Sequence, residues 1–84
     1  MNIFCAELSH HDKVIKAVYF TNVNAAMLMC NDWVEDLVIK ATDGDPDALE
    51  YKVRVMDYSD RADDILEYWQ VFDTVTDYYK ECAA

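Results

Sequence analysis

Carboxylates are the most abundant side chains in this chain that could do chemistry. The 84 residues include 17 Asp and Glu against 7 Lys and Arg, so the formal net charge is -10. Catalysis by a pair of carboxyl groups needs two such groups in contrasting environments within one cleft. Nothing in the spacing of these residues selects one pair, so the acidity by itself does not predict general acid–base catalysis.

Two short segments carry residue types that bind metals. Asp43, Asp45 and Asp47 resemble the opening of a calcium-binding loop, but that loop needs Gly at its sixth position and Glu at its twelfth. This chain has Ala48 and Arg54 there. The segment is therefore interpreted as an acidic, solvated turn.

The second segment is His10-His11-Asp12, in a turn-like stretch. Zinc sites draw their ligands at set spacings and usually include Cys. Two adjacent histidines in a tight turn cannot easily face one ion. We therefore expect no metal site and no cofactor.

Motifs of nucleophilic and phosphate chemistry are absent from the sequence. There is no Gly-rich phosphate loop, no G-x-S-x-G, no H-E-x-x-H and no Cys–His signature. The three cysteines, Cys5, Cys30 and Cys82, are odd in number and form no C-x-x-C. We expect Cys5 and Cys30 to be small buried apolar residues, no disulfide framework, and a protein that is not an enzyme.

Hydrophobic periodicity indicates the elements that position these residues. Residues 2–8 and 13–21 have the composition of two strands, joined as a hairpin. Asn22 is a good N-cap for a helix that runs from Val23 to about Thr42. Residues 49–57 alternate as a half-exposed strand, and a last helix is predicted from about Asp60 to about Glu81.

Each predicted helix has an apolar stripe at steps of three and four residues. Outside the stripe of the first helix lie three further apolar residues, Leu28, Met29 and Ile39, which are free to contact a partner. The expected buried residues are Ala26, Met27, Cys30, Trp33, Val34, Leu37, Val38 and Ala41 in the first helix and Ile65, Leu66, Trp69, Phe72, Thr76 and Tyr79 in the second.

The element order is strand–strand–helix–strand–helix, which predicts one α+β domain over residues 1–84. We expect a three-stranded antiparallel sheet with both helices packed on it. No apolar run reaches the roughly 18–20 residues of a transmembrane helix. The N-terminus lacks a basic start followed by an apolar core, so we expect a cytoplasmic protein.

The negative charge is concentrated in the last two-thirds of the chain. Residues 1–30 have a net charge of zero, residues 31–56 of -4 and residues 57–84 of -6. Phosphate binding needs a surplus of Lys and Arg. The acidic surplus therefore argues against direct binding of nucleic acid and indicates a basic partner instead.

In the last predicted helix, acidic residues recur at helical spacing, as Asp63, Glu67 and Asp77 do. Carboxylates four residues apart on a helix are separated by about 6 Å, which is similar to the separation of phosphates along one strand. An ordinary solvated face mixes the two signs of charge, so this one-sidedness favours a functional surface, with solubility as the alternative. The candidate partner-binding residues are Asp60, Asp63, Asp64, Glu67, Asp77 and Glu81, the off-stripe tyrosines Tyr68 and Tyr78, and Glu35 and Asp36 of the first helix.

The chain resembles small phage and mobile-element proteins that disarm bacterial defence. These are the anti-CRISPR proteins and the antirestriction DNA mimics. The resemblance lies in its length, its element order and the acidic residues that gather on one side of the last predicted helix, Asp60, Asp63, Asp64, Glu67, Asp77 and Glu81. The resemblance implies a non-enzymatic inhibitor whose acidic, Tyr-rich surface blocks the nucleic-acid-binding site of a host defence complex. The partner would be a CRISPR effector, a restriction enzyme or a nuclease, met in the host cytoplasm if the protein is phage-encoded.

Two other functions stay open from the sequence. An immunity protein or antitoxin would also be small and acidic, and would neutralise a nuclease by charge-complementary binding. An ordinary interaction subunit would instead use Leu28, Met29 and Ile39 as its contact surface.

Overall fold

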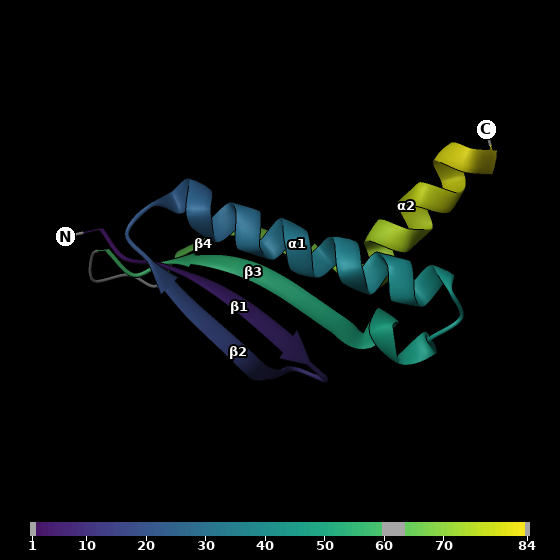
Figure 1. Ribbon diagram of the computed structural model, residues 1–84, viewed down its shortest axis with the longest axis horizontal. Coiled ribbons are helices and arrows are strands. Elements are labelled where there is room, and N and C mark those ends of the chain that lie inside the picture. The colour runs from purple at the N-terminus through teal and green to yellow at the C-terminus, as the bar shows by residue number, and fades with distance from the viewer. Residues whose placement is uncertain (1, 60–63, 84) are drawn as a thin grey trace.

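The fold is α+β, as predicted, with a four-stranded antiparallel sheet and a long helix lying along one face of it (Figure 1). A computed structural model describes residues 2–59 and 64–83, with the side chains of residues 2–59 and 65–77. The elements are β1 (Phe4–His10), β2 (Lys13–Phe20), α1 (Val23–Thr42), the 3₁₀ helix η1 (Pro46–Glu50), β3 (Tyr51–Asp57), β4 (Asp64–Gln70) and α2 (Val71–Ala83). The strand order is β2-β1-β3-β4. Among the described residues, no helix is both long enough and apolar enough to cross a membrane.

The first half of the chain folds close to the prediction. The strands β1 and β2 form the expected hairpin. The side-chain oxygen of Asn22 accepts a hydrogen bond from the backbone N–H of Asn24 at 2.8 Å, so Asn22 caps α1 as predicted. The helix then runs from Val23 to Thr42. Only the strand bounds differ, because pairing continues up to His10 and leaves a turn of two residues.

That turn is formed by His11 and Asp12, both of which have positive φ, at 51° and 65°. Two-residue hairpin turns of this kind need positive φ at both central positions, because this backbone twist matches that of the strands. His and Asp tolerate the left-handed region better than most residues. The Asp12 carboxylate also accepts a hydrogen bond from Lys52 Nζ at 2.7 Å, which ties the turn to β3 and lowers the pKa of Asp12.

The core lies between the sheet and α1. Ala6, Leu8, Val53 and Val55 face it from the two central strands. The helix contributes four buried residues to it, Ala26, Cys30, Val34 and Leu37, all of which belong to the predicted stripe. Cys5 and Cys30 are buried and free, as expected. Burial raises the pKa of Cys30 to about 11, so that this thiol stays protonated at neutral pH.

The prediction of three strands is wrong, because residues 64–70 form a fourth strand where a helix was expected. This strand pairs antiparallel with β3. Without it, the outer edge of β3 would present unpaired N–H and C=O groups. The segment Ile65 to Trp69 is rich in apolar and aromatic residues that also suit a strand. Pairing with a neighbouring strand therefore overrides the local helical spacing.

The change of element also moves the buried positions. Ile65, Leu66 and Phe72 were expected in the core but are exposed. The buried residues of α2 are Val71 and Val75. The helix begins directly after β4 and extends away from the sheet (Figure 1), so the second helix covers much less of the sheet than predicted.

We expect Val53→Ala to lower the free energy of unfolding by about 2 kcal/mol, because this fully buried side chain would lose its apolar contacts and leave a cavity. Val14→Ala is the matched control, because Val14 is 43% exposed and its loss should cost less than about 0.5 kcal/mol. Urea denaturation followed by circular dichroism measures both values. Equal losses at the two positions would contradict the position of Val53 in the core.

Candidate functional site

The outer side of α1 carries a stripe that combines acidic and apolar side chains. Leu28, Asp32, Glu35 and Ile39 follow one another at steps of four, three and four residues, which places them on one side of the helix. All four are exposed. Leu28 is 65% exposed and Ile39 is 52% exposed, so neither of these large apolar side chains contributes much to the core.

The segment that connects α1 to β3 carries further acidic residues. Asp43, Asp45, Asp47 and Glu50 are all exposed. Between residues 31 and 50 the only basic side chain is Lys40. The stripe and this connection together form one acidic surface, called here the α1 acidic face. Its seven carboxylates are those of Asp32, Glu35, Asp36, Asp43, Asp45, Asp47 and Glu50.

The structure places Glu35 and Asp36, two of the predicted partner-binding residues, on this face. Asp36 lines a hollow with Lys16 and Lys40, so its charge is partly offset. Glu35 lies between Leu28 and Ile39 on the outer stripe. Asp32 shares that position, although the sequence analysis did not include it among the binding candidates. The signal that could have selected it is its helical spacing with Leu28 and Glu35.

The candidates near the C-terminus do not form the predicted helical stripe. Glu67 lies on β4 and Asp77 on α2, and both are exposed. Because the two elements differ in direction and in side-chain period, these carboxylates cannot form one row at helical spacing. Asp60 and Asp63 lie outside the described residues. For Asp64, Tyr78 and Glu81 the structure describes only the backbone.

The described tyrosines gather mainly on the sheet face opposite α1. Tyr19 pairs with Cys5, and Tyr68 pairs with Arg54. Side chains of paired residues point to the same face, and Cys5 and Arg54 alternate with the core-facing residues of their strands. Tyr19 is 64% exposed. The acidic and the tyrosine-rich surfaces, which the sequence analysis placed together, are therefore on opposite sides of the described structure.

A buried carboxylate lies near the centre of the sheet face opposite α1, called here the open face. Glu7 is only 6% exposed, although no helix of the described residues covers it. Its two oxygens accept hydrogen bonds from Arg54 Nε at 2.6 Å and from the Tyr58 hydroxyl at 2.7 Å. Glu7 and Arg54 are opposite each other in the pairing of β1 with β3. The contact with Glu7 raises the pKa of Tyr58, because a carboxylate stabilises the protonated phenol.

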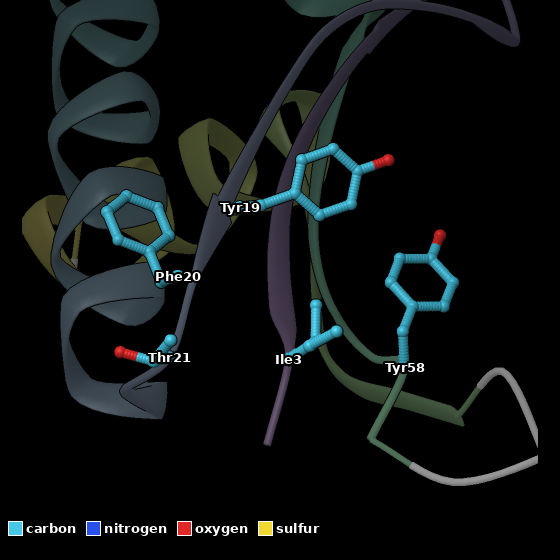
Figure 2. A pocket seen from close by; sticks show the side chains of 5 residues that line it. All are labelled: Ile3, Tyr19, Phe20, Thr21 and Tyr58. Atoms are coloured by element: carbon cyan, nitrogen blue, oxygen red, sulfur yellow. The ribbon is translucent and has the colours of Figure 1, made fainter. Parts of the chain in front are cut away.

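Beside this network lies an apolar hollow of about 520 Å³ at the end of the sheet (Figure 2). Its lining includes Ile3, Tyr19, Phe20 and Tyr58. The rings of Tyr19 and Tyr58 are 6.4 Å apart. Among the described residues, the only polar side chains of its lining are the hydroxyls of Tyr19, Tyr58 and Thr21, so the hollow offers mainly apolar contact area.

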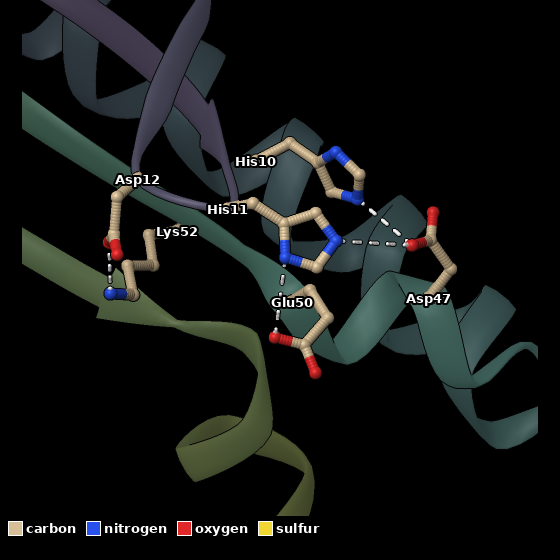
Figure 3. Close-up of polar contacts among 6 residues, drawn as sticks. All are labelled: His10, His11, Asp12, Asp47, Glu50 and Lys52. Atoms are coloured by element: carbon tan, nitrogen blue, oxygen red, sulfur yellow. Dashed lines mark hydrogen bonds and ion pairs between the residues drawn. The ribbon is translucent and has the colours of Figure 1, made fainter.

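A third group of polar side chains lies at the opposite end of β1. The rings of His10 and His11 are 4.2 Å apart, and both approach Asp47 of η1 (Figure 3). His10 Nε2 lies 2.9 Å and His11 Nε2 3.9 Å from the same oxygen, Asp47 Oδ1. His11 Nδ1 lies 3.9 Å from Glu50 Oε2. Among the described residues, His10, His11 and Asp47 form the one group whose donors could hold a metal ion.

From the sequence, two adjacent histidines in a tight turn were not expected to face one ion easily, but both rings of this turn approach Asp47. His10 ends a strand and His11 has positive φ, which turns both rings toward η1. Asp47 is 37 residues from His10 in the sequence. No local motif connects these positions, so the sequence could not indicate the third member of the group.

Comparisons of the chain with protein-family models, with curated proteins and with solved structures give no match.

We expect Tyr58→Phe to lower the free energy of unfolding by about 1.5 kcal/mol near neutral pH, because Glu7 loses a hydrogen-bond donor. The folded state holds the Tyr58 proton more tightly than the unfolded state, so this contribution is lost as pH rises above about 10. The stability gap between wild type and variant should therefore narrow there. Urea denaturation at several pH values measures it, with Tyr19→Phe as the control because Tyr19 is exposed. A gap that stays constant with pH would contradict this account.

Proposed function

We propose that the protein is a non-enzymatic inhibitor that binds the cationic, nucleic-acid-binding surface of another protein through its α1 acidic face. The observation that carries the proposal is the composition of that face. Seven exposed carboxylates follow one helix and its connection to β3, a stretch whose one basic residue is Lys40, and Lys16 of β2 lies near one of them, Asp36. Such a surface attracts a basic groove and speeds the encounter with it.

The spacing of the carboxylates supports mimicry of a phosphate row. Asp32 and Glu35 are three residues apart on α1, and Asp32 and Asp36 are four apart, so the rise along the axis is about 4.5–6 Å. A helix holds this spacing rigidly, so that little ordering entropy is lost on binding. The proposed target class is the one that the sequence resemblance implies, a CRISPR effector, a restriction enzyme or a nuclease.

Leu28 and Ile39 favour a protein partner over simple solvation. A face that serves only solubility does not need two large exposed apolar side chains among its carboxylates. The two residues are eleven positions apart, which is about 16 Å along α1. Apolar anchors surrounded by charged residues are typical of the contact surfaces between proteins.

The test compares two triple variants with the same change in charge. The first, Asp32→Asn with Glu35→Gln and Asp36→Asn, neutralises the acid of α1. The second, Glu67→Gln with Asp73→Asn and Asp77→Asn, neutralises three exposed carboxylates of β4 and α2. Because both variants lose three negative charges, a difference between them reports the position of the charge and not its amount.

We expect the wild-type protein, used as bait in bacterial lysate, to capture nucleic-acid-binding proteins that added duplex DNA or higher salt releases. The α1 triple variant should reduce this capture by about ten-fold or more, and the β4–α2 triple variant should leave it nearly unchanged. Quantitative mass spectrometry measures both. Unchanged capture by the α1 variant would overturn the proposal, and capture of one nuclease that DNA does not release would favour an immunity protein.

A further inference from the structure

We propose that His10, His11 and Asp47 form a binding site for a divalent transition-metal ion of the zinc type. The site would join the β1–β2 turn to η1. The inference does not rest on the proposed function. Asp47 belongs to the α1 acidic face, but the site depends on the two histidines beside it, and the outer stripe of α1 takes no part in it.

The donor geometry fits one small ion. Zinc bonds to nitrogen and to carboxylate oxygen are about 2.0–2.2 Å long, so two ligand atoms of a tetrahedral site lie about 3.4 Å apart. The distances from Asp47 Oδ1 to His10 Nε2 and to His11 Nε2 are 2.9 and 3.9 Å, on either side of that value. All three donor atoms lie within 4.8 Å of one another. Small side-chain rotations would bring them to bonding distance.

The donor types select the class of metal. Imidazole nitrogen suits zinc, copper, nickel and iron, whereas magnesium and calcium prefer a shell of oxygens. With two imidazoles and one carboxylate, the site favours the first group of metals. Three protein ligands leave a fourth position for water.

The surroundings of the His11 ring resemble those of a metal-bound histidine. Such a histidine usually directs its second nitrogen to a carboxylate or carbonyl, which fixes the ring and strengthens the ligand. His11 Nδ1 faces Glu50 Oε2 at 3.9 Å, while its Nε2 faces Asp47 (Figure 3). The His10 ring packs against Tyr51, with centroids 4.4 Å apart. Both rings are therefore oriented by neighbours outside the proposed ligand set.

The backbone at His11 supports the same inference. His11 has a φ of 51°, a conformation that Gly adopts most readily and that Asn, Asp and His tolerate better than most residues. A two-residue turn of this kind favours Asn-Gly. Histidine tolerates this conformation less well than Gly, and at this position it brings the second imidazole toward Asp47.

The test uses the untagged chain, freed of metal by a chelator and titrated with Zn²⁺ in a calorimeter. We expect one ion to bind per chain, EDTA to reverse binding, and Ca²⁺ and Mg²⁺ to give no saturable signal. Bound Zn²⁺ should also raise the Tm, because the ion binds the folded state. Absence of saturable Zn²⁺ binding would overturn the proposal.

Two variants and a control locate the ion. His11→Asn keeps a residue that accepts positive φ, so the metal-free variant should fold with a Tm near that of the wild type while its Zn²⁺ affinity falls about ten-fold or more. Asp47→Asn should weaken binding in the same way. Asp43→Asn removes an exposed carboxylate of the same connection and should leave the affinity unchanged. Equal weakening of Zn²⁺ binding by all three variants would show that the ion is attracted by acidic residues in general, and it would overturn the proposed site. Unchanged Zn²⁺ affinity in His11→Asn would overturn it as well.

Discussion

One helix covers one face of the sheet, and the rest of the structure follows from this constraint. A chain of 84 residues supplies a single long helix, α1, which packs on the two central strands. Among the residues that the structure describes, no helix lies on the opposite face. It is closed at its centre by the Glu7 carboxylate, whose charge Arg54 and Tyr58 satisfy. An unpaired buried charge is strongly destabilising. The two hydrogen bonds therefore stabilise the buried Glu7 carboxylate in the middle of β1, on a face that no described helix covers.

The same constraint separates the chemistry of the two sides. The helix side is acidic, because the residues of α1 that do not face the core are free to carry charge. The open side presents the aromatic rings of Tyr19 and Tyr68, with Lys52 and Arg54 beside Tyr68. A partner that binds one side therefore meets a very different surface from a partner that binds the other.

The sequence predicted the elements whose signals are local. The Asn22 cap and the three-and-four spacing after it gave the bounds of α1, and the β-branched residues gave the first hairpin. The segment 64–70 could not be assigned in this way, because Ile65, Leu66 and Trp69 fit a helical stripe as well as a strand. Its pairing with β3 decides the outcome, and pairing is a contact between separate segments. The contact of His10 with Asp47 could not be predicted for the same reason. The exposed positions of Glu35 and Asp36, in contrast, followed from the predicted bounds of the first helix.

The pairing of β1 with two neighbours has a consequence for the order of folding. Two residues separate β1 from β2, whereas β3 begins about 40 residues after β1 ends. A hairpin with so short a turn forms within microseconds, while the second pairing must wait for α1 and η1 to bring β3 back. During synthesis, the hairpin would leave the ribosome with one edge of β1 unpaired. The rate-limiting step of folding is then expected to be the insertion of β3 beside β1, and not the formation of any single element.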